Sequence, residues 1–246
     1  MLLQRLKEYA EARLQLPPRL YTEVPVRYII ELDSSGRLLA PAPVDTADRA
    51  SPQTRRGTRR YAPSVQRASR IKPLLLADNA EYTLGLAREQ SNPQRVQECH
   101  RAYLELLHQC ARETGEPAVQ AVLHFLQNSP LSRLELPEDF DRGAFITFRV
   151  GDSFVVDLPA VQAFWAQWND PAAAGAPKMQ CLVCGQERPV LRRLQEKVKG
   201  VPGGQSSGTA LISANAPAFE SYGLSESLIA PTCAECGEKF TKAINA

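Results

Sequence analysis

The chain has 246 residues, of which 43% are hydrophobic, and this length predicts a globular protein with one large or two small domains. Its formal net charge is only +2, which excludes any argument for nucleic-acid binding from overall charge, so electrostatic evidence must come from local clusters. Charges interrupt the apolar N-terminus too early for a secretory signal, and no later stretch approaches the ~20 apolar residues of a membrane span. We therefore expect a cytoplasmic protein without a membrane partner.

The first elements are a helix and a pair of strands. Apolar residues recur at helical spacing over residues 2–16, and a Pro-Pro pair ends this pattern. Residues 24–32 are rich in β-branched and aromatic types, and the turn sequence 33–36 separates them from a second run, 37–44, whose prolines confine it to a sheet edge. The sequence predicts an amphipathic helix followed by an antiparallel hairpin.

A basic segment, residues 49–72, follows the hairpin. It contains seven arginines and no acidic residue, and prolines and a glycine interrupt it. Two interpretations stay open, because a charge run in turn-rich sequence is often only a solvated loop, whereas clustered arginines can replace counterions along a nucleic-acid backbone. The candidate phosphate contacts are Arg55, Arg56, Arg59 and Arg60.

The next part of the chain predicts helices and a second hairpin. Residues 96–112 and 117–127 have helical periodicity, residues 143–150 and 153–158 flank a Gly-Asp turn, and residues 161–168 form a short aromatic helix. The three histidines have no cysteine or carboxylate at a matching offset, so we expect none of them to bind metal. We expect an α+β fold with an N-terminal domain of mixed helices and antiparallel hairpins, residues 1–170, and a linker, residues 171–180.

Two copies of Cys-x-x-Cys-Gly dominate the rest of the sequence. Two thiolates three residues apart can reach one ion from a tight turn, and two such turns supply the four ligands of a structural zinc site. A redox dithiol, a disulfide pair and buried core cysteines are the alternatives. The glycine after each pair suits a turn with positive φ. The sequence predicts a zinc module over residues 181–246 with the structural Zn²⁺ ligands Cys181, Cys184, Cys233 and Cys236.

The sequence lacks the complete motifs of three classes of enzyme. Residues 204–208 match Gly-x-Ser-x-Gly, but a proline and a glycine precede the serine and no histidine follows it to act as a base. The glycine-rich run lacks the Gly-Lys-Ser/Thr ending of a phosphate-binding loop, and the chain has no His-x-Glu motif of a nucleobase deaminase. Four cysteine ligands would also leave zinc no open position for a water nucleophile. We expect a binding module and not an enzyme.

The insertion between the cysteine pairs, residues 197–223, combines polar side chains with glycine and proline. Small residues allow a backbone to approach a ligand closely, hydroxyls suit phosphate oxygens, and glutamine or asparagine can pair with a base edge. An ordinary polar loop of a zinc domain is the alternative. The candidate DNA contacts are Lys197, Lys199, Gly203, Gly204, Gln205, Ser206, Ser207 and Asn215.

This insertion carries a family resemblance. Residues 199–223, from Lys-Gly-Val-Pro-Gly-Gly-Gln to Phe-Glu-Ser-Tyr-Gly, closely resemble the signature segment of the large subunit of the type I-C CRISPR surveillance complex, or Cascade. Residues 2–9, 26–37, 73–85 and 150–165 are similar to further elements of that family, as are 230–231 and 240–245. Many family members have other residues at some of the four cysteine positions, so zinc is predicted from the spacing and not from the resemblance.

The resemblance implies a non-catalytic subunit that recognises the protospacer-adjacent motif in double-stranded DNA and helps to open the target strand. Its implied partners are the guide RNA, the Cascade backbone subunits and a recruited helicase-nuclease. Family chains run well beyond residue 246, so we expect the N-terminal, motif-sensing portion of such a subunit. The alternative from another class is a zinc-ribbon RNA-binding or transcription adaptor, in which the insertion contacts proteins.

Overall fold

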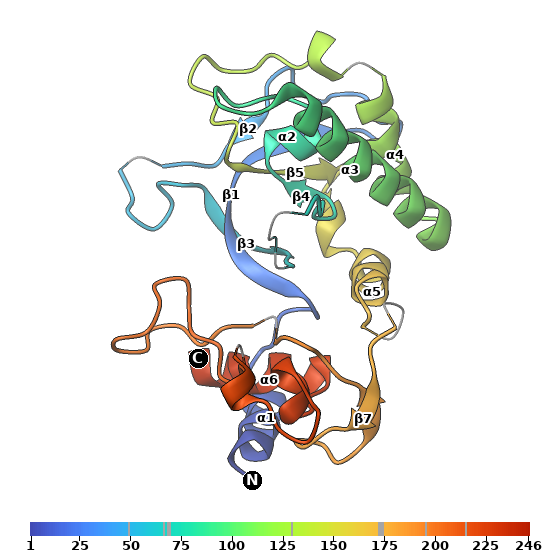
Figure 1. The fold of residues 1–246 in the computed structure, drawn as a ribbon. Coiled ribbons are helices and arrows are strands. Elements are labelled where there is room, and N and C mark those ends of the chain that lie inside the picture. Colours follow the sequence, from blue (N-terminus) through green and yellow to red (C-terminus); the bar gives the residue numbers. More distant parts are fainter. Residues whose placement is uncertain are drawn as a thin grey trace. The chain divides into compact units, whose positions relative to one another are not determined.

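A computed structural model describes all residues except 49, 66, 68–69, 129, 172–174, 195 and 215. Its contacts divide the chain into two compact units, which are drawn in Figure 1. The sheet unit is Leu20–Ala166, and the cysteine unit combines Met1–Arg19 with Gln167–Ala246. In this division residues 1–19 group with the C-terminal residues, whereas the prediction placed them in an N-terminal domain of residues 1–170, and residues 178–180 of the predicted linker form a strand.

The sheet unit is built on one long strand, β1 (Tyr21–Leu32), whose side chains alternate between buried and more exposed positions along much of its length. This alternation follows from the two-residue period of a strand that has one face on the core. Antiparallel neighbours of β1 are β3 (Thr58–Pro63) and β2 (Val44–Asp45), and its other edge pairs with β5 (Phe145–Val150). The short strands β4 (Ala77–Asp78) and β6 (Ser153–Phe154) both pair with β5. The main strand order is β2-β1-β5-β4.

The predicted mixture of helices and strands is confirmed, but the expectation of antiparallel hairpins alone is wrong. β1 and β5 are parallel, with Ile29 opposite Thr147 and Leu32 opposite Val150. Parallel neighbours need a long crossover, and the chain between these strands supplies one that contains the main helices. The first hairpin is reduced to the two residues of β2, and much of the pairing of β1 goes to β3, inside the segment predicted as a loop.

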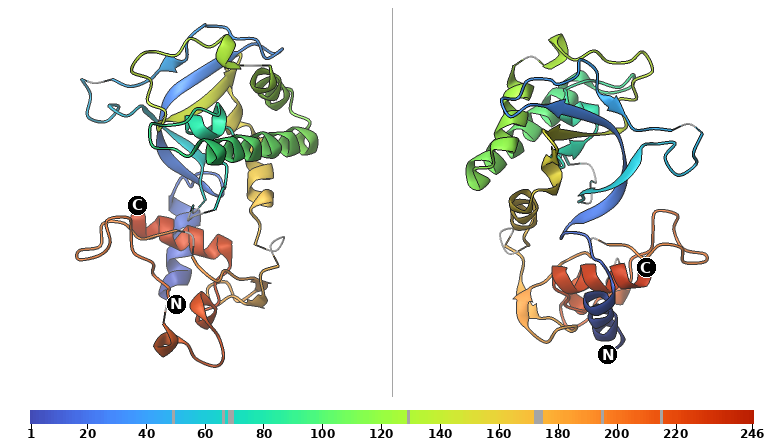
Figure 2. Two further views of the ribbon diagram at one scale, coloured as in Figure 1. Left: turned by 45° about the horizontal axis from the view of Figure 1, so that its top comes forward. Right: turned by 180° about the vertical axis from the view of Figure 1, so that it is seen from behind.

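The helices α2 (Ala80–Thr83), α3 (Pro93–Thr114) and α4 (Pro117–Gln127) gather on one side of the sheet (Figures 1 and 2). The boundaries of α3 follow from its sequence, because the Asn92 side chain caps its first turn and Gly115 takes a left-handed conformation after its end. α5 (Pro159–Trp168) ends this part of the chain, and Trp165 donates from Nε1 to the carbonyl of Leu20 over 3.1 Å. No helix in the described residues is long and apolar enough to cross a membrane.

The cysteine unit contains two helices, α1 (Leu2–Arg13) and α6 (Ala234–Asn245), and a two-stranded sheet of β7 (Lys178–Gln180) and β8 (Glu187–Pro189). α1 packs against α6 although more than 200 residues separate them in the sequence. The ammonium group of Lys239 on α6 lies 2.7 Å from Glu11 on α1 and 2.6 Å from Glu235. These hydrogen bonds lower the pKa of both carboxyl groups, so both ion pairs are present near neutral pH, and the pair of Lys239 with Glu11 links the two helices.

Candidate metal centre and nucleic-acid interface

The first cysteine pair lies in the tight turn between β7 and β8. The backbone N–H of Cys181 donates to the carbonyl of Gln186 over 2.9 Å, and the N–H of Gly185 donates back to the carbonyl of Cys181 over 2.8 Å. Gly185 has φ +72°, as the sequence predicts for the glycine that follows a pair. This turn brings the Cys181 and Cys184 side chains to the same side of the backbone.

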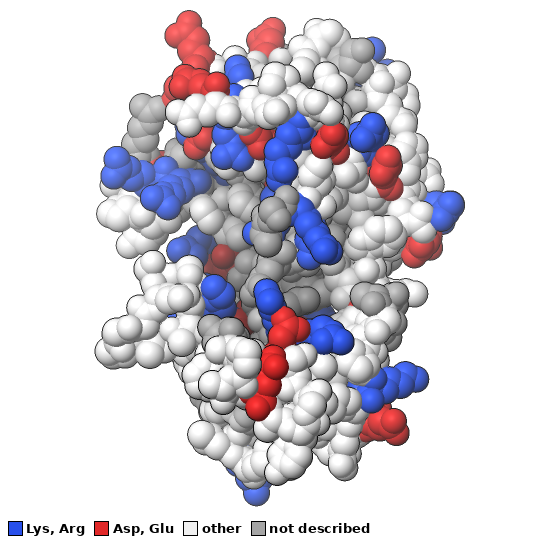
Figure 3. All heavy atoms as spheres, viewed as in Figure 1, with Lys and Arg blue, Asp and Glu red and all other residues white. Residues whose placement is uncertain are grey.

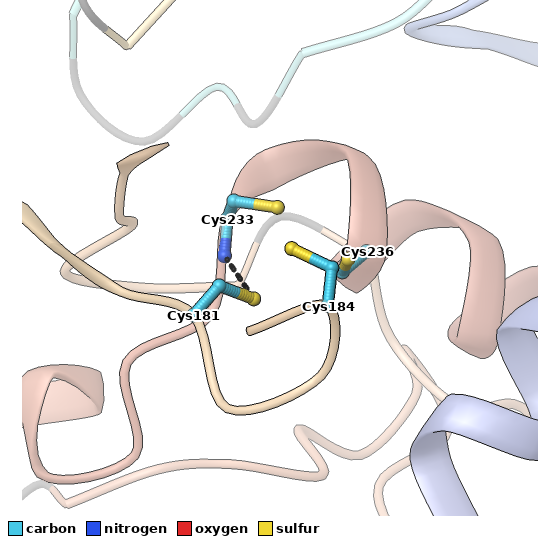
Figure 4. Close-up of side chains that lie close together, drawn as sticks. All are labelled: Cys181, Cys184, Cys233 and Cys236. Carbon is cyan, nitrogen blue, oxygen red and sulfur yellow. Dashed lines mark hydrogen bonds between the residues drawn. The ribbon is translucent and has the colours of Figure 1, made fainter. Parts of the chain in front are cut away.

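The second pair begins helix α6. Cys233 is the residue that precedes the first turn, and Cys236 lies within that turn. The N–H of Cys233 donates to Sγ of Cys181 over 3.4 Å, which joins the two pairs directly (Figure 4). The prediction that Gly237 forms a second turn with positive φ is wrong, because Gly237 is an α-helical residue of α6. A Cβ added there would lie only 3.0 Å from the Leu194 side chain, so this glycine permits close packing.

The four side chains converge on one point (Figure 4), with all four Sγ atoms within 4.8 Å of one another. Tetrahedral Zn–S bonds of about 2.3 Å require sulfurs about 3.8 Å apart, so the spacing is compatible with one ion after small adjustments. No disulfide links any of the four. In the part of the chain that the structure describes, no other group of histidine, cysteine and carboxylate side chains has a metal-binding arrangement. These four cysteines can therefore hold a metal ion.

The thiols strongly influence one another. The hydrogen bond from Cys236 lowers the pKa of Cys233 to about 5, and the same contact raises the pKa of Cys236. Burial is the main cause of the raised pKa of Cys184. Without metal, the cluster thus favours one thiolate that accepts hydrogen bonds from its neighbours. A bound cation would replace those protons, because metal-bound cysteines are thiolates.

Apolar side chains enclose the cluster. Val183, Leu194 and Phe240 are buried against it, and Leu3 and Leu6 of α1 pack on the same core. Cys181, Cys233 and Cys236 are almost inaccessible to water, whereas Cys184 is partly exposed. A closed site of four sulfurs within an apolar core is suited to holding structure.

The insertion begins with a loop, residues 198–209, which one antiparallel bridge closes at its base and which is called the hairpin below. Val198 and Thr209 exchange backbone hydrogen bonds of 2.9 and 2.8 Å at its base, and the loop between them extends away from α6 (Figures 1 and 2). Gln205, Ser206 and Ser207 are exposed in this loop. The hairpin therefore presents one amide and two hydroxyl groups to the solvent.

The glycines of the hairpin are needed for its own backbone conformation and close packing. Gly203 has positive φ, and so does Gly208, where a Cβ would lie 2.8 Å from the Cβ of Lys197. A Cβ at Gly204 would lie 2.5 Å from Oγ1 of Thr209. The prediction assigned Gly203 and Gly204 to close approach of a ligand. The structure shows that Gly204 is already needed for close approach within the chain.

The two predicted lysines lie at the base of the hairpin, with Lys199 exposed and Lys197 partly buried. The structure thus places these cations near the exposed polar loop, as a phosphate contact would require. The predicted contact Asn215 lies outside the described residues.

The four candidate arginines of the sheet unit fall into two classes. Arg55 and Arg56 are exposed on the projecting loop between β2 and β3 and have no hydrogen-bonding partner in the described residues. Arg59 pairs with Glu23 at 3.0 Å, and Arg60 pairs with Asp157 at 2.5 Å. Arg60 also lies over the ring of Phe154, 3.5 Å from its centroid. Lys and Arg side chains gather at the end of this loop (Figure 3). Of the four candidate arginines, Arg55 and Arg56 have no carboxylate partner among the described residues.

From the sequence we expect Phe219, Tyr222 and Leu224 to pack the zinc module and not to stack on bases, but the two aromatic residues do not pack it. Phe219 is 60% exposed, and Tyr222 is 98% exposed. Leu224 is partly buried, as expected for a packing residue. The interpretation failed because an aromatic residue in a glycine-rich segment has no periodicity that indicates its direction.

One residue that the sequence did not single out contacts the hairpin. Asn245, at the end of α6, forms two hydrogen bonds with the backbone of residues 197 and 199. No sequence signal could have found it, because its partners are backbone atoms more than 40 residues away.

The model of a family described as CRISPR-associated protein (Cas_Csd1) matches residues 2–246. The match covers both cysteine pairs, the hairpin and the loop that carries Arg55 and Arg56. No match was found among curated proteins.

Proposed function

Because the chain belongs to the Cas_Csd1 family of CRISPR-associated proteins, we propose that it is a DNA-binding large subunit of a type I-C CRISPR surveillance complex. In this role it recognises the protospacer-adjacent motif in duplex DNA and helps to open the target strand. It works in the cytoplasm with guide RNA, the Cascade backbone subunits and a recruited helicase-nuclease. The family match favours this role over that of a zinc-ribbon adaptor.

The observation that carries the proposal is the exposed hairpin of residues 198–209. It presents Gln205 at the surface, and a glutamine amide can donate to and accept from a base edge at once. Ser206 and Ser207 offer hydroxyls to phosphate, and the Lys199 cation lies at the hairpin base. A ligand that combines phosphates with base edges matches this set of groups.

The metal in this proposal is Zn²⁺ with a structural role. Four sulfur ligands are typical of structural zinc, and the spacing of the Sγ atoms is compatible with tetrahedral coordination. The cysteines would hold together the turn after β7 and the start of α6, and the ion would neutralise their charge. Four protein ligands leave no position for a substrate.

We propose that the subunit is not catalytic. The Gly-x-Ser-x-Gly match lies within a polar hairpin, whereas a hydrolase elbow joins a strand to a helix. Ser206 is exposed at that loop, and no histidine follows it in the sequence to act as the base of such a triad.

The test compares a motif-bearing duplex with a duplex in which the motif is scrambled. Gln205→Ala should lower affinity for the motif-bearing duplex by about 1–3 kcal/mol and should leave scrambled DNA nearly unaffected, since a base contact discriminates between sequences. Fluorescence anisotropy of the whole chain, and of the assembled complex, measures both affinities.

The matched control is Gln167→Ala, which removes an exposed glutamine side chain outside the hairpin. It should change neither affinity. Equal losses on both duplexes in the Gln205→Ala variant would reject base readout. Co-purification with polymerase or ribosomal components in place of guide RNA would support the adaptor.

A further inference from the structure

Helix α6 connects the two parts of the candidate site. Its start carries Cys233 and Cys236, and its last residue, Asn245, contacts the base of the hairpin. A helix rises about 1.5 Å per residue, so about 18 Å separates Cys233 from Asn245 along its axis. The helix is packed between these points, because Phe240 is fully buried in the core around the cysteines. The hairpin is therefore anchored to a helix that is itself fixed in the core of the cysteine unit.

The side-chain amide of Asn245 pairs with the backbone like a neighbouring strand. Its Oδ1 accepts from the N–H of Lys199 at 2.8 Å, and its Nδ2 donates to the carbonyl of Lys197 at 2.9 Å. Between these residues, the N–H and C=O of Val198 pair with Thr209. Backbone groups of successive residues in an extended segment point to opposite edges, so Asn245 pairs with the edge that Thr209 leaves open.

This contact matters because the hairpin has few other restraints. The bridge between Val198 and Thr209 is isolated, and an isolated two-stranded hairpin is at best marginally stable in water. The turn hydrogen bonds, such as that from Gly204 to Val201, shape the loop but do not attach it to the rest of the unit. Among the described residues, Asn245 provides the side-chain hydrogen bonds that join the hairpin base to α6.

We propose that Asn245 is a positioning residue, which fixes the base of the hairpin and so holds Gln205 where it can read a base edge. This inference rests on the proposed function. It adds that specificity depends on a side chain that does not touch DNA. A loose hairpin would keep its cations, and so its general affinity for phosphate, but it would lose the fixed direction that base readout requires.

The experiment uses Asn245→Ala in the whole chain with two measurements. The first is amide hydrogen exchange without DNA, in which the Lys199 amide should exchange about tenfold faster because it loses its acceptor. The second is the ratio of affinities for motif-bearing and scrambled duplexes, which should fall about tenfold while the affinity for scrambled DNA stays constant. Asn245→Asp keeps the acceptor for Lys199 and should have an intermediate exchange rate.

Two controls separate positioning from a general loss of structure. Ile244→Ala changes the neighbouring residue of the same helical turn, which is 37% exposed, and should alter neither measurement. In a Gln205→Ala background, Asn245→Ala should cause no further loss of discrimination, since both changes remove the same base contact.

The outcomes distinguish this inference from the proposed function. Unchanged exchange at Lys199 in Asn245→Ala overturns the positioning role whatever the DNA result. Faster exchange with full discrimination overturns it also, because the pose of the hairpin would then be irrelevant to reading. If the unaltered chain, alone and in the assembled complex, does not distinguish the two duplexes, the proposed motif recognition fails, and the exchange measurement still decides whether Asn245 orders the hairpin.

Discussion

Tyr222 has a backbone conformation that residues with side chains usually avoid. Its φ is +54°, and the next residue, Gly223, has φ +71°. The two occupy the centre of a turn closed by the hydrogen bond from Leu224 N–H to the Ser221 carbonyl, 2.9 Å long. Two successive positive φ angles characterise the type I′ turn, for which Asn-Gly is the preferred pair. Tyrosine has neither the small side chain nor the local hydrogen bonding that makes asparagine suitable there.

We therefore predict that Tyr222→Asn raises the free energy of unfolding of the cysteine unit by about 1 kcal/mol, because it relieves backbone strain. The lost ring costs little, since it is 98% exposed. Chemical denaturation followed by circular dichroism measures the change. Phe219→Asn is the control, because Phe219 is also exposed but does not have positive φ, and it should not stabilise the unit. Equal effects of the two substitutions would contradict the strain argument.

At the scale of single residues, the sequence predicts which chemical groups form a site better than it predicts where their side chains point. The cysteine spacing identified all four members of the thiol cluster, because Cys-x-x-Cys is a local pattern with one geometric solution. The exposure of Tyr222 and the contacts of Asn245 depend on where distant backbone lies, which no local pattern records. Gly185 and Gly237 follow the same motif, yet only Gly185 needs positive φ, because Gly237 lies inside α6.

At the scale of the elements, the arginines of strand β3 differ from those of the loop that precedes it. Arg59 and Arg60 belong to β3, where each has a carboxylate partner, whereas Arg55 and Arg56 lie on the loop before the strand. A guanidinium that is already paired must break that pair before it can neutralise a phosphate. The loop arginines are thus the better candidates for DNA contact.

We predict that neutralising Arg55 and Arg56 together weakens binding on every duplex and lowers the slope of log affinity against log salt by about 2. Neutralising Arg59 and Arg60 should change the slope less and should lower the stability of the sheet unit by about 1 kcal/mol, because it removes the contact of Arg60 with Phe154 and two ion pairs. Binding titrations at several salt concentrations measure the slopes. An unchanged slope in the Arg55 and Arg56 variant would identify a solvated loop without a DNA contact.

The helices were predictable as elements, and the sheet was not. α3 and α4 have clear apolar periodicity, both begin with a proline, and α3 has a capping asparagine, so their boundaries fell within a few residues of the prediction. The parallel pairing of β1 with β5 joins segments more than 110 residues apart. A strand pattern indicates which face is buried but does not identify the neighbouring strand.

At the scale of the whole molecule, the described residues form two hydrophobic cores, one in each unit. The core of the sheet unit includes Tyr103, Phe148 and Trp165, and the core of the cysteine unit surrounds the four thiols. The second core consists of six buried residues, three of which are cysteines of the thiol cluster, so a bound metal would contribute a large part of its cohesion. The two units should therefore differ in their dependence on metal.

We predict two unfolding transitions, of which only one responds to metal removal. A chelator should lower the melting temperature of the cysteine unit and leave that of the sheet unit unchanged, because ligand binding to the folded state stabilises only the unit that binds. Differential scanning calorimetry with and without chelator resolves the two, and inductively coupled plasma mass spectrometry identifies the metal.

Cysteine variants determine whether the metal acts through the thiol cluster. Cys181→Ala removes one ligand and should abolish the response to chelator together with the bound metal. Cys110→Ala removes a buried cysteine of the sheet unit, so it should destabilise that unit and leave the response intact. A chelator effect on the sheet-unit transition, or a normal response in Cys181→Ala, would contradict the assignment. Loss of metal should also release α1, since Leu3 and Leu6 pack on the core that the cysteines complete.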